Sequence, residues 1–410
     1  GNVSLTMALL GLRVVELEGL GPGPLAACML ADFGADVVSV SRAVKGHIMS
    51  QGDPVSRGKR SIALDLKTDL GLKILRDLVA RADVFIEAFR PGVVEKLGIG
   101  PEVLCGLNPR LVYARMTGFG QGGTAFEGMA GHDANYLALS GVLDFFRRGN
   151  ERPFPPANYA GDYAGGSAMM VIGVLLAYIE RLRSGRGQVV DAAMVDGASY
   201  IALPLFKWAQ AAKFLPVKAD GHIDAERFVL CQAPHYVDTY LCKEDGGKPG
   251  TKQYMSVQAI EPQFYAELLR GLGLEAEQSL PMQNEQSQWQ AMKERFASIF
   301  LTKTRDEWAA VFAGSDACCV PVLNASEAAM HPHNVKRGTF APTPGKEGLF
   351  EPAPAPHLSR TPGHKPRPSP RPGQDFEGIL AELGYTDEHV AALLTSGVVT
   401  APRRSGKASK

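Results

Sequence analysis

Apolar runs and helical segments alternate over the first half of the chain. The short apolar runs lie at 12–17, 36–42, 60–67, 83–89, 111–120 and 187–194. Between several of them stand segments with apolar residues at helical spacing, such as 25–35 and 68–82. Strand, helix and strand in this order are typical of right-handed βαβ units and predict a parallel sheet. An α/β domain is therefore expected here, with ligand sites where the apolar runs end in loops.

The pattern changes after about residue 215. Residues 233–274 contain two β-rich runs around a glycine-containing turn and then a helical segment, which predicts a smaller α+β lobe. Prolines are too frequent in 339–375 for a regular helix or a central strand, so this stretch is expected to be extended. We expect three parts: 7–215 as the first part of a large domain, 216–330 as a small domain, and 331–402 as a proline-rich return segment whose C-terminal helices join the large domain.

Composition and charge argue against nucleic acid and membranes as partners. The chain has 410 residues with 43 basic and 43 acidic side chains, so no net charge attracts it to nucleic acid. The apolar run at 168–179 is shorter than the roughly 20 residues needed to cross a bilayer. It predicts a buried helix and no membrane association. The first residues lack the order of a secretory signal, so an intracellular protein is expected.

The six cysteines show no metal-ligand spacing. Their positions, mostly in apolar stretches, favour reduced and buried thiols over disulfides or zinc. No metal site is therefore expected. The glycine-proline stretch at 19–24 superficially resembles a dinucleotide loop, but Pro22 and Pro24 lack the amide protons that would face a pyrophosphate. A structural turn is the better interpretation.

Two acid/base side chains stand at predicted helix starts beside glycine-rich loops. His132 follows the six glycines of 117–131 and precedes a helical segment, a position that favours the neutral imidazole. Asp162 stands beside Gly161 where the buried helix begins. A lone histidine is often a hydrogen-bonded core residue and an aspartate here often only caps a helix, so both alternatives stay open. Together, the two groups predict a pair that flanks one substrate carbon, with the Asp162 amide as a donor to an oxyanion.

Several basic residues fall near the predicted strand ends. They are either scattered surface charges or one edge that holds a polyanionic ligand, because arginine binds phosphate with two hydrogen bonds. These residues are Arg42, Arg57, Lys59, Arg60, Lys67 and Arg90.

Four longer motifs resemble the class III CoA-transferase family, and in particular its racemases. They are "RGKRSIALDLK" (57–67), "YARMTGFGQGG" (113–123), "GHDANYLALSGVL" (131–143) and "AIEPQFYAELLRGLGL" (259–274). The resemblance extends over nearly the whole chain. It implies a Rossmann-like large domain with a parallel sheet plus a smaller α+β domain. It also implies an interlocked homodimer whose active site is shared between the large domain of one chain and the small lobe of the other.

The resemblance also implies roles for single residues. His132 and Asp162 match the acid/base pair of the racemases, and Glu261 matches a glutamate that assists them. Coenzyme A enters as part of the substrate, and no separate cofactor is implied. The residues that the resemblance assigns to coenzyme A binding are Arg42, Leu64, Asp65, Leu66, Lys67, Arg90, Gly131, Asp133, Ala134, Asn135 and Tyr136.

The activity implied is inversion at the α-carbon of 2-methyl-branched acyl-CoA thioesters, an isomerase reaction of lipid metabolism that proceeds through an enolate. One alternative is a CoA-transferase in which Asp162 attacks the thioester, although such enzymes usually carry an apolar residue in place of His132. Another is a CoA-binding protein without catalysis. Two departures from the racemases, the ending "GKASK" and a longer stretch at 241–255, leave the compartment and the acyl chain open.

Overall fold

The computed structural model describes residues 7–43, 54–148, 151–211, 234–247 and 250–402. The chain divides into two compact units. The large unit comprises Gly1–Leu143, Pro155–Ala202 and Pro332–Lys410, and the small unit comprises Asp144–Phe154 and Leu203–His331. The large unit is thus discontinuous in sequence, and its last segment follows the small unit.

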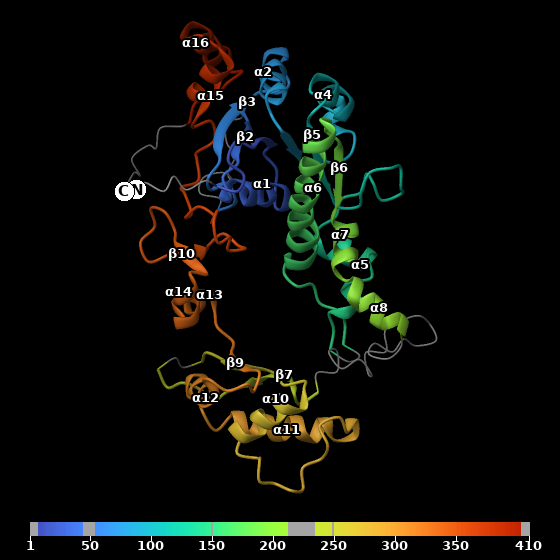
Figure 1. Ribbon diagram of the computed structural model, residues 1–410, viewed down its shortest axis with the longest axis vertical. Coiled ribbons are helices and arrows are strands. Elements are labelled where there is room, and N and C mark those ends of the chain that lie inside the picture. Colours follow the sequence, from blue (N-terminus) through green and yellow to red (C-terminus); the bar gives the residue numbers. More distant parts are fainter. Residues whose placement is uncertain (1–6, 44–53, 149–150, 212–233, 248–249, 403–410) are drawn as a thin grey trace. The chain divides into compact units, whose positions relative to one another are not determined.

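The large unit is built on a six-stranded parallel sheet (Figure 1), as the sequence predicts. The strand order is β3-β2-β1-β4-β5-β6. This is a doubly wound arrangement: the chain adds strands towards one edge from β1 to β3, and then towards the other edge from β4 to β6. In register, Val15 of β1 pairs with Val38 of β2 and Phe85 of β4. The strands are β1 (Arg13–Leu17), β2 (Asp36–Arg42), β3 (Arg60–Leu64), β4 (Val84–Glu87), β5 (Val112–Thr117) and β6 (Val189–Ala193).

Helices cover both faces of the sheet, which explains why its strands appear in the sequence as nearly continuous apolar runs. One face packs against α2 (Asp69–Ala80), α3 (Val93–Lys96), α4 (Pro101–Leu107), α15 (Phe376–Leu383) and α16 (Asp387–Ser396). The other packs against α1 (Pro22–Asp32), α5 (Asp133–Leu139) and α6 (Met169–Ser184), with the start of α7 (Met194–Ile201). The stretch 19–24 forms the turn into α1, where Gly21 at φ 69° is the N-cap.

The proline-rich segment returns the chain to the large unit. After α14 (Pro332–Arg337) it forms only a short hairpin of β10 (Phe340–Pro342) and β11 (Phe350–Pro352), and no further helix begins before α15. Arg367 donates to the Gly58 carbonyl over 2.9 Å, and the Asp375 amide donates to the Ser61 carbonyl. These contacts hold an extended chain against the edge strand β3.

A π-helix, Tyr159–Ala168, runs directly into α6. By length and composition, the combined helix Tyr159–Ser184 is able to cross a membrane, although only 39% of its most apolar window is buried. A helix in the core of a folded domain passes the same test, and Met170, Val174 and Ala177 pack in the core here. The predicted buried helix is therefore buried along one side.

The small unit is α+β, as expected. Its antiparallel sheet consists of β7 (Val237–Leu241), β8 (Tyr254–Gln258) and β9 (Cys319–Pro321). Aromatic rings dominate its core, where the rings of Tyr240 and Phe300 stack with their centroids 4.9 Å apart. The described helices of this unit are α8 (Leu203–Ala211), α10 (Pro262–Gly271), α11 (Trp289–Phe300), α12 (Arg305–Phe312) and α13 (Ala325–Met330).

Candidate active site

His132 stands at the N-cap of α5, at the helix start that the sequence predicts. Its backbone is extended, with φ −136° and ψ 173°, and its side chain is exposed. The His132 amide donates to Asn135 Oδ1 over 3.1 Å. This contact ties the His132 main chain to the third residue of the helix.

Asp162 lies in the first turn of the π-helix. The two residues before that helix, Ala157 and Asn158, have φ of 50° and 63°, a conformation that only a constrained turn imposes on side chains other than glycine. Asn158 Nδ2 donates to Asp162 Oδ2 over 2.8 Å. Burial raises the pKa of Asp162, while the hydrogen bond from Asn158 and the charge of His132 oppose the rise. His132 and Asp162 therefore share one electrostatic environment.

Asp133 connects the two helix starts. Its buried Oδ1 accepts from the amide of Gly161 over 2.6 Å and from the amide of Asp162 over 2.8 Å. The expectation that the Asp162 amide serves as an oxyanion donor is therefore wrong, because Asp133 already occupies that amide. A Cβ at Gly161 would lie 2.7 Å from Asp133 Oδ1, so this approach requires glycine.

Tyr136 ties the glycine-rich loop to α5. Its hydroxyl donates to the Gly131 carbonyl, and its ring packs edge-on against Phe119 at 5.0 Å between centroids. Burial raises the pKa of Tyr136 to about 12, and the charge of Arg90 opposes that rise. Arg90 thus lies close to α5, together with Gly131 and Tyr136. Ala134 and Asn135 follow in the first turn of the same helix.

Five of the residues predicted to bind coenzyme A line one pocket of about 210 Å³ at the carboxyl ends of β1, β2 and β3. These five are Arg42, Leu64, Asp65, Leu66 and Lys67, and they are joined there by Leu17, Glu18, Val40, Ser41, Phe89 and Leu97. This is the edge at which doubly wound sheets hold their ligands. Within the described residues, no ion pair is recorded for Arg42, Lys67 or Arg90.

The other three basic residues of the proposed edge are structural, which corrects that hypothesis. Arg57 pairs with Asp32 at 2.7 Å and Glu351 at 2.9 Å. Lys59 and Arg60 are paired in the same way, Lys59 with Glu16 and Arg60 with Asp36 and Glu382. Their carboxylate partners lie on other strands and helices, so these cations stabilise the fold.

Glu261 belongs to the small unit, whereas His132 and Asp162 belong to the large one. It is exposed and stands at the N-cap of α10, immediately before Pro262. The described cysteines Cys28, Cys105, Cys242, Cys318 and Cys319 are free thiols, and Cys231 lies outside the described residues. Over the described ranges, no cluster of three potential metal ligands occurs.

Asn158 is the site residue that the sequence interpretation missed. The signal was present, because asparagine tolerates positive φ and often stands at turns before helices. Its position four residues before Asp162 allows their side chains to meet within one turn of the π-helix. π-Helical turns are rare, and many of them occur at functional sites. Nothing in this sequence distinguishes the π-helix from an α-helix.

Comparison with known proteins adds independent information. Residues 9–376 match the family model for CoA-transferase family III. The chain is 46% identical to mouse alpha-methylacyl-CoA racemase over 96% of this chain and 98% of the mouse protein. It is 43% identical to human alpha-methylacyl-CoA racemase over the same shares of the two chains. A crystal structure of a CaiB/BaiF family protein from Brucella suis, 24% identical, superposes with a TM-score of 0.73 over 92% of this chain and 99% of that one, which shows the same fold. The chain therefore belongs to CoA-transferase family III.

Proposed function

We propose that the protein is an isomerase that inverts the α-carbon of 2-methyl-branched acyl-CoA thioesters. The observation that carries this proposal is the pairing of His132 and Asp162 at two helix starts joined by Asp133. The similarity to the mouse and human racemases supports the same reaction. Inversion needs two such groups, because a single group cannot reach both faces of one carbon.

In this scheme one of the two side chains removes the α-proton and the other delivers a proton to the opposite face of the enolate. The raised pKa of Asp162 brings its protonated form closer to neutral pH, where it is able to act as the acid. The exposed His132 serves the other face, and the roles exchange with the hand of the substrate. The enolate oxygen takes its hydrogen bonds from groups other than the Asp162 amide, which Asp133 occupies.

Coenzyme A is proposed to bind along the carboxyl edge of the sheet. The pocket formed by Arg42, the 64–67 loop and Phe89 offers an apolar wall with two cations at its rim. Arg42 and Lys67 are exposed there and suit phosphate groups. Arg90 follows β4, and β4 stands in the sheet between β1, which lines this pocket, and β5, after which α5 carries His132. The effect of its charge on Tyr136 places Arg90 near α5.

The active form is proposed to be a homodimer in which the small unit of the partner completes the site and Glu261 assists the pair. An apolar stripe on α6 supports this proposal, because Ile172, Leu176 and Ile179 are 47%, 64% and 53% exposed at helical spacing. Leu182 and Tyr200 extend the patch. A second copy is the occupant that accounts for it best. Light scattering is expected to give twice the chain mass, and Leu176→Glu is expected to shift the protein towards monomer with loss of activity.

The reaction is tested by incubating one epimer of a 2-methylacyl-CoA in D₂O. We expect inversion with one solvent deuterium incorporated at the α-carbon. His132→Ala is expected to lower inversion by about 10² to 10⁴-fold in both directions while Asp162 still exchanges the α-proton of one epimer with retention. Asp162→Ala is expected to label the opposite epimer.

His333→Ala, at an exposed histidine in α14, is the matched control and is expected to match wild type. A folded His132→Ala protein that inverts at the wild-type rate, or that labels both epimers equally, contradicts the two-base assignment. If hydroxylamine traps a modified aspartate during turnover, the protein is instead a CoA-transferase with Asp162 as nucleophile. Coenzyme A binding without any deuterium uptake would identify a binding protein.

A further inference from the structure

A second pocket lies at the amino edge of the sheet, opposite the edge that carries Arg42 and Lys67. Its cavity of about 370 Å³ falls within the roughly 300–1,000 Å³ typical of small-molecule sites. The first residues of β1, β2 and β3 contribute Arg13, Asp36 and Arg60. The end of α2 and the end of α15 close the other sides, and the whole pocket lies in the large unit.

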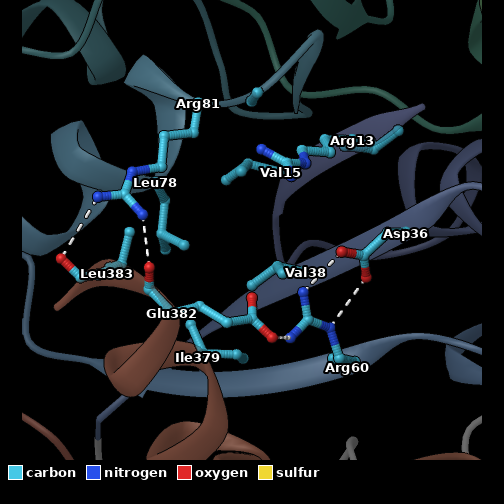
Figure 2. A pocket seen from close by; sticks show the side chains of 12 residues that line it. Arg13, Val15, Asp36, Val38, Arg60, Leu78, Arg81, Ile379, Glu382 and Leu383 are labelled. Carbon is cyan, nitrogen blue, oxygen red and sulfur yellow. Dashed lines mark hydrogen bonds and ion pairs between the residues drawn. The ribbon is translucent and has the colours of Figure 1, made fainter. Parts of the chain in front are cut away.

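The walls of this amino-edge pocket are apolar. Figure 2 shows Val15 and Val38 on the sheet side, and Leu78, Ile379 and Leu383 on the helices around them. Val15, Val38, Leu78 and Ile379 are buried in the main core, so the hollow is a recess in that core. An apolar recess of this kind is suited to a hydrocarbon chain rather than to a fully polar ligand.

Three arginines surround the recess, and they are not equivalent. Arg60 is satisfied by Asp36 through bonds of 2.9 and 2.6 Å and by Glu382 at 2.7 Å. Arg81 donates to the main-chain carbonyls of Glu382 at 2.5 Å and Leu383 at 3.4 Å, which carry no charge (Figure 2). Among the residues that line the recess, two carboxylates therefore face three guanidinium groups, which leaves one positive charge in excess. The nearby Asp83 carboxylate does not change this count, because it is paired with Arg181 at 2.5 Å.

Arg13 supplies the guanidinium that is available to a ligand. Its main chain is held by Asp83, whose carboxylate accepts from the Arg13 amide over 2.9 Å. Among the described residues, no hydrogen bond or ion pair of the Arg13 guanidinium is recorded, and the residue is exposed. Figure 2 shows its side chain beside Val15, across the recess from Leu78.

We propose that the amino-edge pocket binds a monocarboxylate with a short hydrocarbon chain, with its carboxylate on Arg13 and its chain against Val15, Leu78 and Ile379. One excess positive charge matches one carboxylate, and the apolar recess matches the chain. A ligand there contacts β1, α2 and α15 together, so it stabilises the packing of α15 on the sheet.

Octanoate is the probe, and calorimetric titration in the presence of saturating coenzyme A is the measurement, because coenzyme A is proposed to occupy the carboxyl-edge pocket and would block octanoate there. We expect saturable binding that weakens about tenfold in Arg13→Gln, since one charge-assisted hydrogen-bond partner is lost. Arg13→Lys is expected to retain part of the affinity. Arg360→Gln, at an exposed arginine elsewhere in the large unit, is the matched control and is expected to bind as wild type does.

Chemical variants of the probe test the contributions of its carboxylate and of its hydrocarbon chain separately. Acetate, which lacks the chain, is expected to bind at least tenfold more weakly, and octylamine, which reverses the charge, is expected not to bind. Equal octanoate affinity in wild type and Arg13→Gln overturns the proposal, as does octylamine binding at the strength of octanoate or no octanoate binding at all. None of these outcomes bears on the isomerase reaction, which is measured separately.

Discussion

Six basic residues near the strands of one sheet divide into two groups that behave differently. Arg57, Lys59 and Arg60 are each paired with carboxylates from other elements. The second group, Arg42, Lys67 and Arg90, has no ion pair recorded in the described part of the chain, and two of its members line the carboxyl-edge pocket. Charge type is the same in both groups. What separates them is whether the fold itself already supplies the opposite charge.

The sharpest way to test this division is to break the most buried pair, for which the largest effect is expected. Lys59 Nζ lies 2.7 Å from Glu16 Oε2, and both side chains are 1% exposed. Lys59→Met removes one partner and leaves the Glu16 carboxylate in the core, so we expect the free energy of unfolding to fall by about 3–5 kcal/mol. Urea unfolding of the purified protein measures the loss.

Lys67→Met is the matched control from the unpaired group and is expected to change the unfolding free energy by less than about 0.5 kcal/mol. The double variant Glu16→Gln with Lys59→Met is expected to recover part of the loss, because no charge is then left buried. Equal effects of Lys59→Met and Lys67→Met would remove the distinction between the two groups.

His235 in the small unit is a third case, a buried ionisable group that has no opposite charge beside it among the described residues and is kept neutral by burial. It is buried, its Nε2 lies 2.8 Å from the Tyr265 hydroxyl, and burial lowers its pKa from 6.5 to about 4. The folded state therefore resists protonation. The contribution of His235 to stability is full above pH 6.5 and is lost as the pH falls from 6.5 towards 4, by about 3 kcal/mol in total.

The three tryptophans report on this change, since Trp208, Trp289 and Trp308 all lie in the small unit. Their fluorescence during urea unfolding at a series of pH values is expected to show the loss between pH 6.5 and 4. His235→Gln is expected to be less stable at pH 7 but to show a shallower pH dependence over the same range. An unchanged slope in this variant would assign the acid sensitivity to other groups.

The smallest effect is expected from the unpaired group itself. Arg42→Gln is predicted to raise KM for acyl-CoA about tenfold while kcat and the melting temperature stay near wild type, because a contact far from the reacting carbon contributes mostly uniform binding. Steady-state kinetics and a thermal melt measure both properties. Arg57→Gln is expected to show the reverse pattern, with a lower melting temperature and little change in KM. A reduced kcat with unaltered KM in Arg42→Gln would place Arg42 elsewhere in the mechanism.

The sequence predicts the sheet well for a local reason. A strand buried on both faces is a continuous apolar run, so β2 is found with the same bounds as its run at 36–42. His132 is also placed correctly at a helix start, because glycine before it and apolar periodicity after it are local signals. These features need no knowledge of residues distant in the chain.

The errors arise where a distant residue decides the outcome. The Asp162 amide looks available in sequence, but its acceptor is Asp133, 29 residues earlier. Arg60 looks available for phosphate, but one of its partners, Glu382, lies 322 residues later. Neither contact produces a periodic pattern of residues in the sequence. The close approach of Gly161 to Asp133 is seen only when the two helix starts are placed together in the fold.

The discontinuity of the large unit has a consequence for synthesis on the ribosome. Ile379, Leu380 and Leu393 complete the core over β2, β3 and α2, yet they leave the exit tunnel only after the whole small unit has been synthesised. The small unit is continuous over 203–331 apart from one short segment, Asp144–Phe154, that emerges earlier. Since domains generally fold as units in the order of their synthesis, the small unit is able to fold while one face of the large sheet is still uncovered. That exposed apolar face is the surface that a nascent-chain chaperone would bind until α15 and α16 arrive.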